Sequence, residues 1–251
     1  MLSNKSIIYK TVAVLLALTA WQAASVLLGS EILLVSPVKA LSRMITLFGE
    51  KEFFSTLLFT LARIAVGFFG GLTLGILLAV LAGRYKVIEY LLWPYMITVK
   101  SVPIASFVII ALMWFSASWL SSFVAFLIVL PIVYTNLLAG IRATDKKLIE
   151  MADVLKMPRI KRFRFVYVPT ITPFLVSGCK LSVGLAWKAG VAAELIGIPE
   201  GSVGESLYFS KLFLNTADLF AWTLAIIIVS VLFEKIFMLV LRKITERILR
   251  V

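Results

Sequence analysis

Residues 60–82 read TLARIAVGFFGGLTLGILLAVLA, and Arg63 is their only charged side chain. A helix needs about 20 apolar residues to cross the roughly 30 Å hydrocarbon core of a membrane. The run is therefore long enough to span a membrane as a single helix. It ends in a short basic loop that contains Arg84 and Lys86.

Five other apolar runs of similar length lie along the chain, at about 7–28, 88–115, 119–140, 170–193 and 219–241. Of the 251 residues, 61% are hydrophobic and 15% are charged. Soluble domains are about half apolar and about a quarter charged, so this chain lacks the polar residues to cover a soluble surface. We predict an all-α integral membrane protein with about six transmembrane helices in one domain, residues 1–251.

The first run permits two interpretations. Ala20 and Ala23–Ala24 resemble the cleavage region of a signal peptide, whereas the length of 7–28 suits a retained span. We expect a retained span. Both interpretations place the N-terminus on the cytoplasmic side.

The basic residues are distributed unevenly between the runs. The chain has 25 Lys and Arg against 13 Asp and Glu, a formal net charge of +12. If both termini are cytoplasmic, 17 basic residues lie in inner segments and 4 in outer segments. Because cytoplasmic loops carry the excess of Lys and Arg, this bias predicts cytoplasmic termini and a cytoplasmic segment at 142–168. Topology therefore explains the positive charge, and we expect no nucleic-acid partner.

Within the run 60–82 and just after it, small residues recur every four positions: Gly67, Gly71, Gly75, Ala79 and Gly83. Small residues at this spacing make one helix face flat, so that another helix can approach closely. We expect Gly67, Gly71 and Gly75 to pack against a helix of the same chain. An interface between two subunits is the alternative.

Several polar or helix-breaking residues inside the apolar runs are candidates for a substrate pathway: Lys100, Ser101, Pro103, Asn136, Lys180, Trp187 and Lys188. A lysine facing lipid at the membrane centre costs about 2.5–3.5 kcal/mol, so such lysines turn toward the bundle interior or a cavity. Helix rise places Lys100 and Lys180 at similar depth. Pro94 and Pro103 predict breaks in the third run, and broken helices often line transporter sites. The lysines predict a binding site for a small anion. The alternative is that carbonyl groups and water satisfy the hydrogen bonds of their ammonium groups.

The segment 142–168 is the most charged of the chain and has the pattern of two short helices. Thr144 or Asp145 can cap the first helix. Apolar residues at helical spacing then share one face: Leu148, Ala152 and Leu155. Pro158 suits the first turn of the second helix, in which basic residues alternate with phenylalanines. One interpretation of this composition is a loop lying on anionic membrane lipid.

The same segment resembles the EAA loop of ABC-importer permeases, E-A-A-x3-G-x9-I-x-L-P. Glu150, Ala152 and Pro169 match the Glu, the second Ala and the Pro at the same spacing. Met151 replaces the first Ala, and Lys156 replaces the Gly. Gly commonly ends a helix in the left-handed conformation, which Lys adopts at a cost of about 1 kcal/mol. We therefore expect the turn at Lys156 to be kept.

The resemblance covers nearly the whole chain and is closest to the nitrate, sulfonate and taurine branch of type I permeases. Residues 35–37 are similar to an outer loop of this branch, and residues 185–194 to its fifth-span signature. The resemblance implies a multi-pass protein of the bacterial inner membrane with three partners: a second permease copy, a cytoplasmic ATPase dimer and an extracytoplasmic solute-binding protein. It also implies ATPase contacts by the coupling loop, through Glu150, Ala152, Asp153, Leu155, Lys156, Met157 and Pro169.

Other classes of function are disfavoured by what the sequence lacks. The chain has no histidine, which removes His-based zinc sites and Ser-His-Asp triads, and Cys179 is expected to be a packing residue. It also has no G-x-x-x-x-G-K-[ST] motif, so the resemblance assigns ATP and Mg²⁺ to the partner ATPase. We predict no enzyme activity, metal or cofactor. An ATP-independent channel or carrier is the alternative class; the expected substrate is a sulfonate, nitrate or bicarbonate, or alternatively a neutral or heterocyclic vitamin precursor.

Overall fold

The computed structural model describes residues 4–250, and the side chains of residues 8–248. Within this part all regular structure is helical. The helices are α1 (Asn4–Leu28), α2 (Pro37–Leu47), α3 (Lys51–Arg84), α4 (Lys86–Ser101), α5 (Ile104–Ala111), α6 (Ala117–Arg142), α7 (Lys146–Val154), α8 (Arg159–Arg162), the π-helix η1 (Phe163–Tyr167), α9 (Val168–Gly197), α10 (Val203–Leu212) and α11 (Thr216–Arg250).

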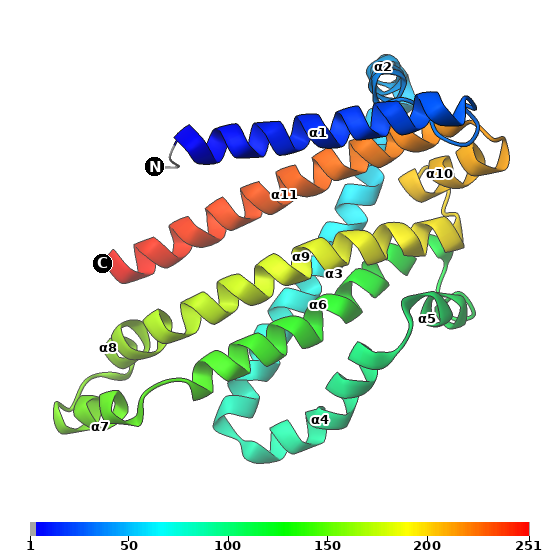
Figure 1. Ribbon diagram of the computed structural model, residues 1–251. Helices are drawn as coiled ribbons and strands as arrows, with labels where there is room; N and C mark the ends of the chain where they lie inside the picture. Colours follow the sequence, from blue (N-terminus) through cyan, green and yellow to red (C-terminus); the bar gives the residue numbers. More distant parts are fainter. Residues whose placement is uncertain (1–3, 251) are drawn as a thin grey trace.

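The long helices run along the molecule and carry the short ones at its two ends (Figure 1). The start of α1, the end of α11, and α7 and α8 lie at one end, which we call the coupling end. The opposite end carries α2, α5 and α10. Five helices are long and apolar enough to cross a membrane, and the bent pair α4 and α5 makes a sixth if it is one span. The predicted fold class is confirmed.

The third predicted span, 88–115, is not a straight helix. Helices α4 and α5 meet at an angle of 103°, because Val102 and Pro103 are extended, with ψ of 129° and 126°. Proline disfavours the helical conformation of the residue before it, so the break falls at Val102. Pro94, by contrast, lies inside α4 without ending it. The prediction of a break at Pro94 is therefore wrong, whereas the break at Pro103 is present.

The glycine stripe of α3 lies against the backbone of α6 in the same chain. A Cβ added at Gly67 would lie 2.1 Å from the carbonyl oxygen of Ser122, and one at Gly71 would lie 2.7 Å from that of Phe126. At Gly75 the corresponding distance, to the carbonyl oxygen of Leu130, is 3.0 Å. Only glycine allows this approach. The stripe is therefore occupied within the chain and is not open to a second subunit.

Glu194, near the end of α9, is completely buried and joins three helices. The Thr60 hydroxyl of α3 donates to its Oε2 at 2.8 Å, and the Gly204 amide of α10 donates to the same oxygen at 3.4 Å. The Thr60 hydroxyl oxygen in turn accepts a hydrogen bond from the Val203 amide at 3.0 Å. This cluster, which we call the Glu194 node, fastens α10 to α3 and α9.

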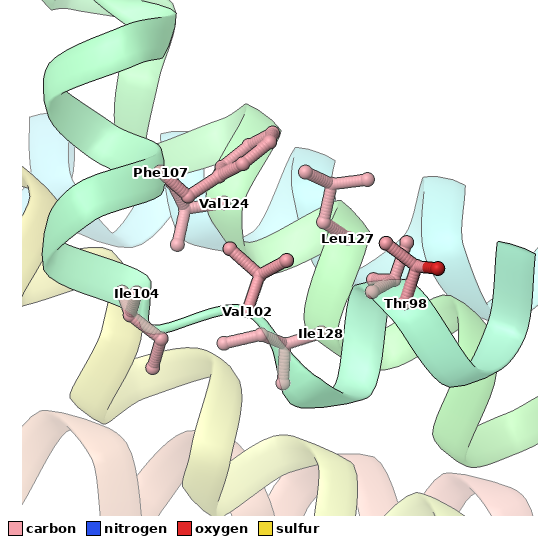
Figure 2. A pocket seen from close by; sticks show the side chains of 8 residues that line it. Thr98, Val102, Ile104, Phe107, Val124, Leu127 and Ile128 are labelled. Carbon is pink, nitrogen blue, oxygen red and sulfur yellow. The ribbon is translucent and has the colours of Figure 1, made fainter.

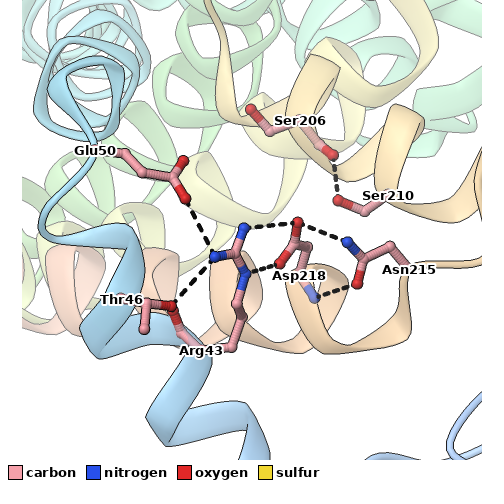
Figure 3. Close-up of polar contacts among 7 residues, drawn as sticks. All are labelled: Arg43, Thr46, Glu50, Ser206, Ser210, Asn215 and Asp218. Carbon is pink, nitrogen blue, oxygen red and sulfur yellow. Dashed lines mark hydrogen bonds and ion pairs between the residues drawn. The ribbon is translucent and has the colours of Figure 1, made fainter.

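Helix α2 is held on α11 by a polar cluster (Figure 3). Arg43 forms an ion pair with Asp218 and a second one, of 3.2 Å, with Glu50. Asn215 also donates to Asp218, at 2.8 Å. The hydrogen bond to Asp218 raises the pKa of Arg43 above its ordinary value.

The apolar side chains of Val38, Leu41 and Ile45 on α2, and of Phe48 just after it, are all exposed. Met44 and Leu47 bury the opposite side of α2. Helix α1 has no fully buried residue among its described side chains. Its Trp21 Nε1 donates to the Val35 carbonyl at 3.0 Å, and its Ser25 hydroxyl donates to the Leu34 carbonyl at 2.9 Å. Apolar exposure of this kind suits surfaces that face lipid.

Candidate functional site

A cavity of about 820 Å³ lies where the α4–α5 break faces α6 and α9. Its wall is mostly apolar. Lys100 and Lys188 are the only charged residues that line it among the described residues, and no carboxylate is among its lining residues. An apolar pocket with a few polar groups is the usual form of a small-molecule site. Here the two ammonium groups give the site a positive charge.

Lys100 reaches the cavity from the last turn of α4. Its Nζ donates to Thr135 Oγ1 of α6 at 3.2 Å. The Thr135 hydroxyl donates to the Pro131 carbonyl at 2.7 Å, which leaves its oxygen to accept from Lys100. Asn136, on the same stretch of α6, donates through Nδ2 to the Ile132 carbonyl at 2.8 Å. Thr135 thus holds Lys100 at the cavity, a role that the sequence did not indicate.

Lys188 lines the cavity from α9. It shares this face of α9 with Leu181, Leu185 and Ala192, which also line the cavity. Residues three or four apart lie above one another on a helix, so this set forms one stripe. A lysine ammonium is a compact point charge with three donors, suited to the oxygens of a small anion.

A smaller apolar pocket of about 110 Å³ adjoins the break (Figure 2). Val102 and Ile104 line both this pocket and the larger cavity. On its other side Phe107 and Val124 approach each other from α5 and α6. The extended residues at the break therefore have unfilled space beside them, so side chains around the α4–α5 break have room to repack.

Three predicted pathway residues do not reach the cavity. Ser101 donates to the Ile97 carbonyl of its own helix at 3.0 Å and is not among the lining residues. Lys180 is exposed on α9, about 12 Å along the helix from Lys188 at a rise of 1.5 Å per residue. Trp187 is buried on another face of α9, 5.9 Å from the ring of Phe233.

These outcomes correct the predicted lysine pair. Lys100 shares the cavity with Lys188, and not with Lys180. The depth estimate treated 88–115 as a straight helix, and the bend of 103° removes its basis. The helical period also separates neighbours, because successive residues point about 100° apart, so Trp187 and Lys188 face different surroundings.

The coupling segment, residues 142–168, forms two short helices and η1. Asp145 caps α7 by accepting from the Lys147 amide at 2.9 Å. At the other end Lys156 has φ of +47°, the left-handed conformation that glycine favours. The Met157 amide donates to the Ala152 carbonyl at 2.9 Å, and the Lys156 amide to that of Asp153 at 3.0 Å. These two bonds form the Schellman turn expected at a glycine, so Lys156 keeps the turn.

Contacts in the coupling segment separate its buried residues from its exposed ones. Asp153 forms an ion pair with Arg162 of α8, which links the two short helices. Ala152 is fully buried within the chain, so it is not available to a partner surface, contrary to our expectation. Glu150 is exposed, as is Pro169 at the start of α9.

Two of the most exposed apolar side chains of the coupling segment, Val154 and Ile160, were not among the predicted contacts, whereas Leu155 was. Val154 and Ile160 are each 82% exposed, and Leu155 is 63% exposed. Large apolar residues in a segment rich in charge were the signal that could have identified them. We call Val154, Leu155 and Ile160 the exposed apolar triad. Exposed apolar groups of this kind mark surfaces that contact another protein or the membrane.

Comparison with known proteins gives the same picture over most of the chain. Residues 71–250 match the family model described as binding-protein-dependent transport system inner membrane component. The putative aliphatic sulfonates transport permease protein SsuC of Bacillus subtilis is 32% identical over 219 residues, 86% of this chain and 79% of that protein.

Two further relatives are similar over comparable lengths. The formylaminopyrimidine transport permease protein ThiX of Halalkalibacterium halodurans is 27% identical, covering 83% of this chain and 82% of that protein. The taurine transport system permease protein TauC of Escherichia coli is 27% identical, covering 89% of this chain and 83% of that protein.

The family places ATP and its hydrolysis on a partner subunit, so this chain is a transport component without an ATPase site of its own. Its long apolar helices agree with a multi-pass protein of the inner membrane. The chain therefore belongs to the binding-protein-dependent inner membrane components, the permease subunits of ABC importers.

Proposed function

We propose that this permease imports a small anion, and that the anion passes through the cavity between the α4–α5 break, α6 and α9. The observation that carries the proposal is the pairing of Lys100 and Lys188 on a cavity whose lining residues include no carboxylate. Both lysines are exposed in the open cavity and no lining carboxylate neutralises them, so their positive potential favours an anionic ligand. The name of one relative, which refers to aliphatic sulfonates, agrees with this class, and the taurine in the name of another carries a sulfonate group beside its ammonium group.

The proposed machinery has two permease copies, a cytoplasmic ATPase dimer and an extracytoplasmic binding protein. The coupling end faces the cytoplasm, where the basic residues are concentrated. Glu150 and the exposed apolar triad contact the ATPase, and Lys156 with Met157 sets the turn that presents them. Closure of the ATPase moves α7 and α8, and through η1 it moves α9, which forms one wall of the cavity.

The α4–α5 break is the second moving part in this proposal. Val102 and Pro103 are extended, and the small apolar pocket beside them leaves space for repacking. Because Lys100 lies two residues before the break, a change in its angle moves the ammonium relative to Lys188. The cavity can thus hold an anion in one arrangement and release it in another, as a two-state element biased by the ATPase.

The test measures import of radiolabelled taurine, sulfate, nitrate and bicarbonate by the whole transporter in liposomes. Lys100→Met and Lys188→Met should each raise the half-saturating concentration by roughly tenfold or more, since a charge-assisted hydrogen bond contributes about 1.5–3 kcal/mol. Lys180→Met is the matched control, because Lys180 is an exposed lysine on the same helix as Lys188 but outside the cavity. Wild-type concentration dependence in both cavity variants would refute the proposal.

A second candidate is a neutral heterocyclic precursor. It is favoured by the mostly apolar cavity lining and by the relative whose name refers to formylaminopyrimidine. The two candidates differ in one observation, the ligand that the cognate binding protein carries. A bound anion supports the first candidate, and an uncharged ring supports the second.

A further inference from the structure

A groove of about 640 Å³ separates α9 from α11 near the coupling end. Thr172 and Val176 form its α9 side. Its α11 side is one stripe of side chains at helical spacing: Lys235, Met238, Leu239, Arg242, Thr245 and Glu246. The groove shares no lining residue with the proposed substrate cavity. It is therefore a separate feature of the fold.

The groove combines an apolar wall with cationic side chains. Val176, Met238 and Leu239 provide apolar surface between Lys235 and Arg242. Arg242 donates from Nε to Glu246 at 2.8 Å. A guanidinium has five N–H donors, so Arg242 can hold Glu246 and an anion at the same time. Arg242 neutralises Glu246, so the charge of Lys235 makes the groove positive overall.

The depth of the two cations fits the inner leaflet of the membrane. Lys235 and Arg242 lie seven residues apart, about 10 Å along α11 at a rise of 1.5 Å per residue. The predicted span, 219–241, with a cytoplasmic C-terminus places Arg242 at the level of the inner lipid headgroups. Lys235 lies deeper, near the level where the headgroup joins the acyl chains. The apolar wall continues toward the membrane centre.

A second cationic feature lies at the same end. The π-helix η1 contacts both α9 and α11. Its Arg164 buries Nε and Nη2 without a hydrogen-bond partner in the part of the chain that the structure describes. Buried polar atoms without a protein partner are rare and indicate a missing water, ion or ligand. An anionic headgroup near η1 would supply acceptors for such donors.

We propose that the α9–α11 groove binds one anionic glycerophospholipid of the inner leaflet. Its phosphate lies by Arg242, its glycerol region by Lys235, and its acyl chains against Val176, Met238 and Leu239. Basic pockets between membrane helices on the cytoplasmic side recognise anionic lipid headgroups in this way. The lipid fills the space between the helix that leaves the coupling segment and α11.

The test compares two lipids added to the detergent-purified transporter, dioleoyl phosphatidylglycerol and dioleoyl phosphatidylcholine, which differ in headgroup charge. Native mass spectrometry counts the lipids retained, and thermal unfolding gives the shift of Tm. The double variant Lys235→Gln/Arg242→Gln removes both cations. Arg247→Gln is the matched control, because it removes one basic charge from the same turns of α11 on a different face.

In the wild type and the control, phosphatidylglycerol should be retained at least tenfold more than phosphatidylcholine and should raise Tm more. In the double variant the two lipids should be equivalent. Three results would overturn the proposal: no preference in the wild type, a preference that survives in the double variant, or an equal loss in Arg247→Gln. No lipid retained by the wild type would also overturn the proposal. None of these measurements needs the transported substrate, so their failure leaves the proposed function untouched.

Discussion

The two ends of α9 differ in how far the chain buries its own side chains. At the end opposite the coupling end, which the predicted topology makes the outer end, Glu194 is fully buried; Thr60 and Gly204 hydrogen-bond its Oε2, and its Oε1 has no partner among the described residues. At the coupling end α9 continues from η1 and α8, where Ile160 is 82% exposed and Arg164 has buried donors without a partner in the described residues. One end is closed within the chain, and the other presents groups for contacts outside it.

This difference indicates which parts of the permease pack fully within its own chain and which parts are left for contacts with partners. A buried carboxylate is tolerated only when hydrogen bonds compensate its desolvation, so the outer end must be assembled correctly for the helix to stay there. Exposed apolar side chains carry no such requirement in the isolated chain, and they gain energy when a partner covers them. Substitutions at the outer end should therefore change stability, and those at the coupling end should change association.

The largest effect is expected for Gly204→Val. A Cβ at this position would lie 2.3 Å from the Cβ of Glu194, so α10 must move off α9. We expect a loss of roughly 3 kcal/mol or more, measured as a lower thermal midpoint and a lower yield of monodisperse permease. Gly184→Val is the control, since no atom lies within 4 Å of an added Cβ there. Equal midpoints for the two variants would contradict the closed outer end.

Glu194→Ala should destabilise the protein by about 2 kcal/mol, because the Thr60 hydroxyl and the Gly204 amide lose their shared acceptor. Glu194→Gln keeps a carbonyl oxygen and should lose less. Thermal unfolding measures both, and hydrogen exchange at Val203 and Gly204 should rise in the alanine variant. Unchanged exchange at these amides would show that the carboxylate does not hold α10.

At the coupling end, Val154→Asp and Ile160→Asp should change the free energy of unfolding of the isolated permease by no more than about 0.5 kcal/mol. Binding of the ATPase should weaken roughly tenfold, because a charge in an apolar contact costs about 1.4 kcal/mol or more. Phe213→Asp places the same charge on an exposed apolar residue next to α10 and serves as the control. If the control weakens ATPase binding equally, the exposed apolar triad is not the contact.

The smallest effect is expected for Lys156→Gly. Lys156 occupies the left-handed region with φ of +47°, and glycine removes a steric cost of about 1 kcal/mol. We expect α7 to be slightly more stable, which slower hydrogen exchange of the amides at positions 156 and 157 would show. Substrate uptake should be unchanged. Lys156→Ala keeps a Cβ and should bring no such gain. Slower exchange in the alanine variant than in the glycine variant would contradict a steric cost of the Cβ at Lys156.

Local features were predictable where short-range chemistry decides them. Asp145 caps α7, Pro103 ends α4, and Lys156 takes the place of a helix-ending glycine; each outcome depends on a few neighbouring atoms. The glycines of α3 also packed as expected, against α6. Pro94 was the exception, because a proline inside a membrane helix is tolerated when neighbouring groups compensate for the lost backbone bond.

Residues of the site were less predictable, because their grouping depends on how distant helices cross. Lys180 and Lys188 carry the same charge on the same helix, yet only Lys188 lines the cavity. Ala152 matches the family motif, yet the chain buries it, and Val154 and Ile160 are left exposed instead. Neither outcome can be derived from spacing along one helix, since the neighbour that covers a face comes from elsewhere in the chain.

The sequence by itself determined the environment and the family of this protein. Apolar runs long enough to cross a membrane and the spacing of Glu150, Ala152 and Pro169 are properties of consecutive residues. Only the tertiary structure decided that Lys100 shares a cavity with Lys188, that Trp187 turns away from it, and that Glu194 is sealed by α3 and α10. The physical reason is that hydropathy and capping act within a few residues, whereas cavities and buried polar nodes arise from the angles at which helices pack.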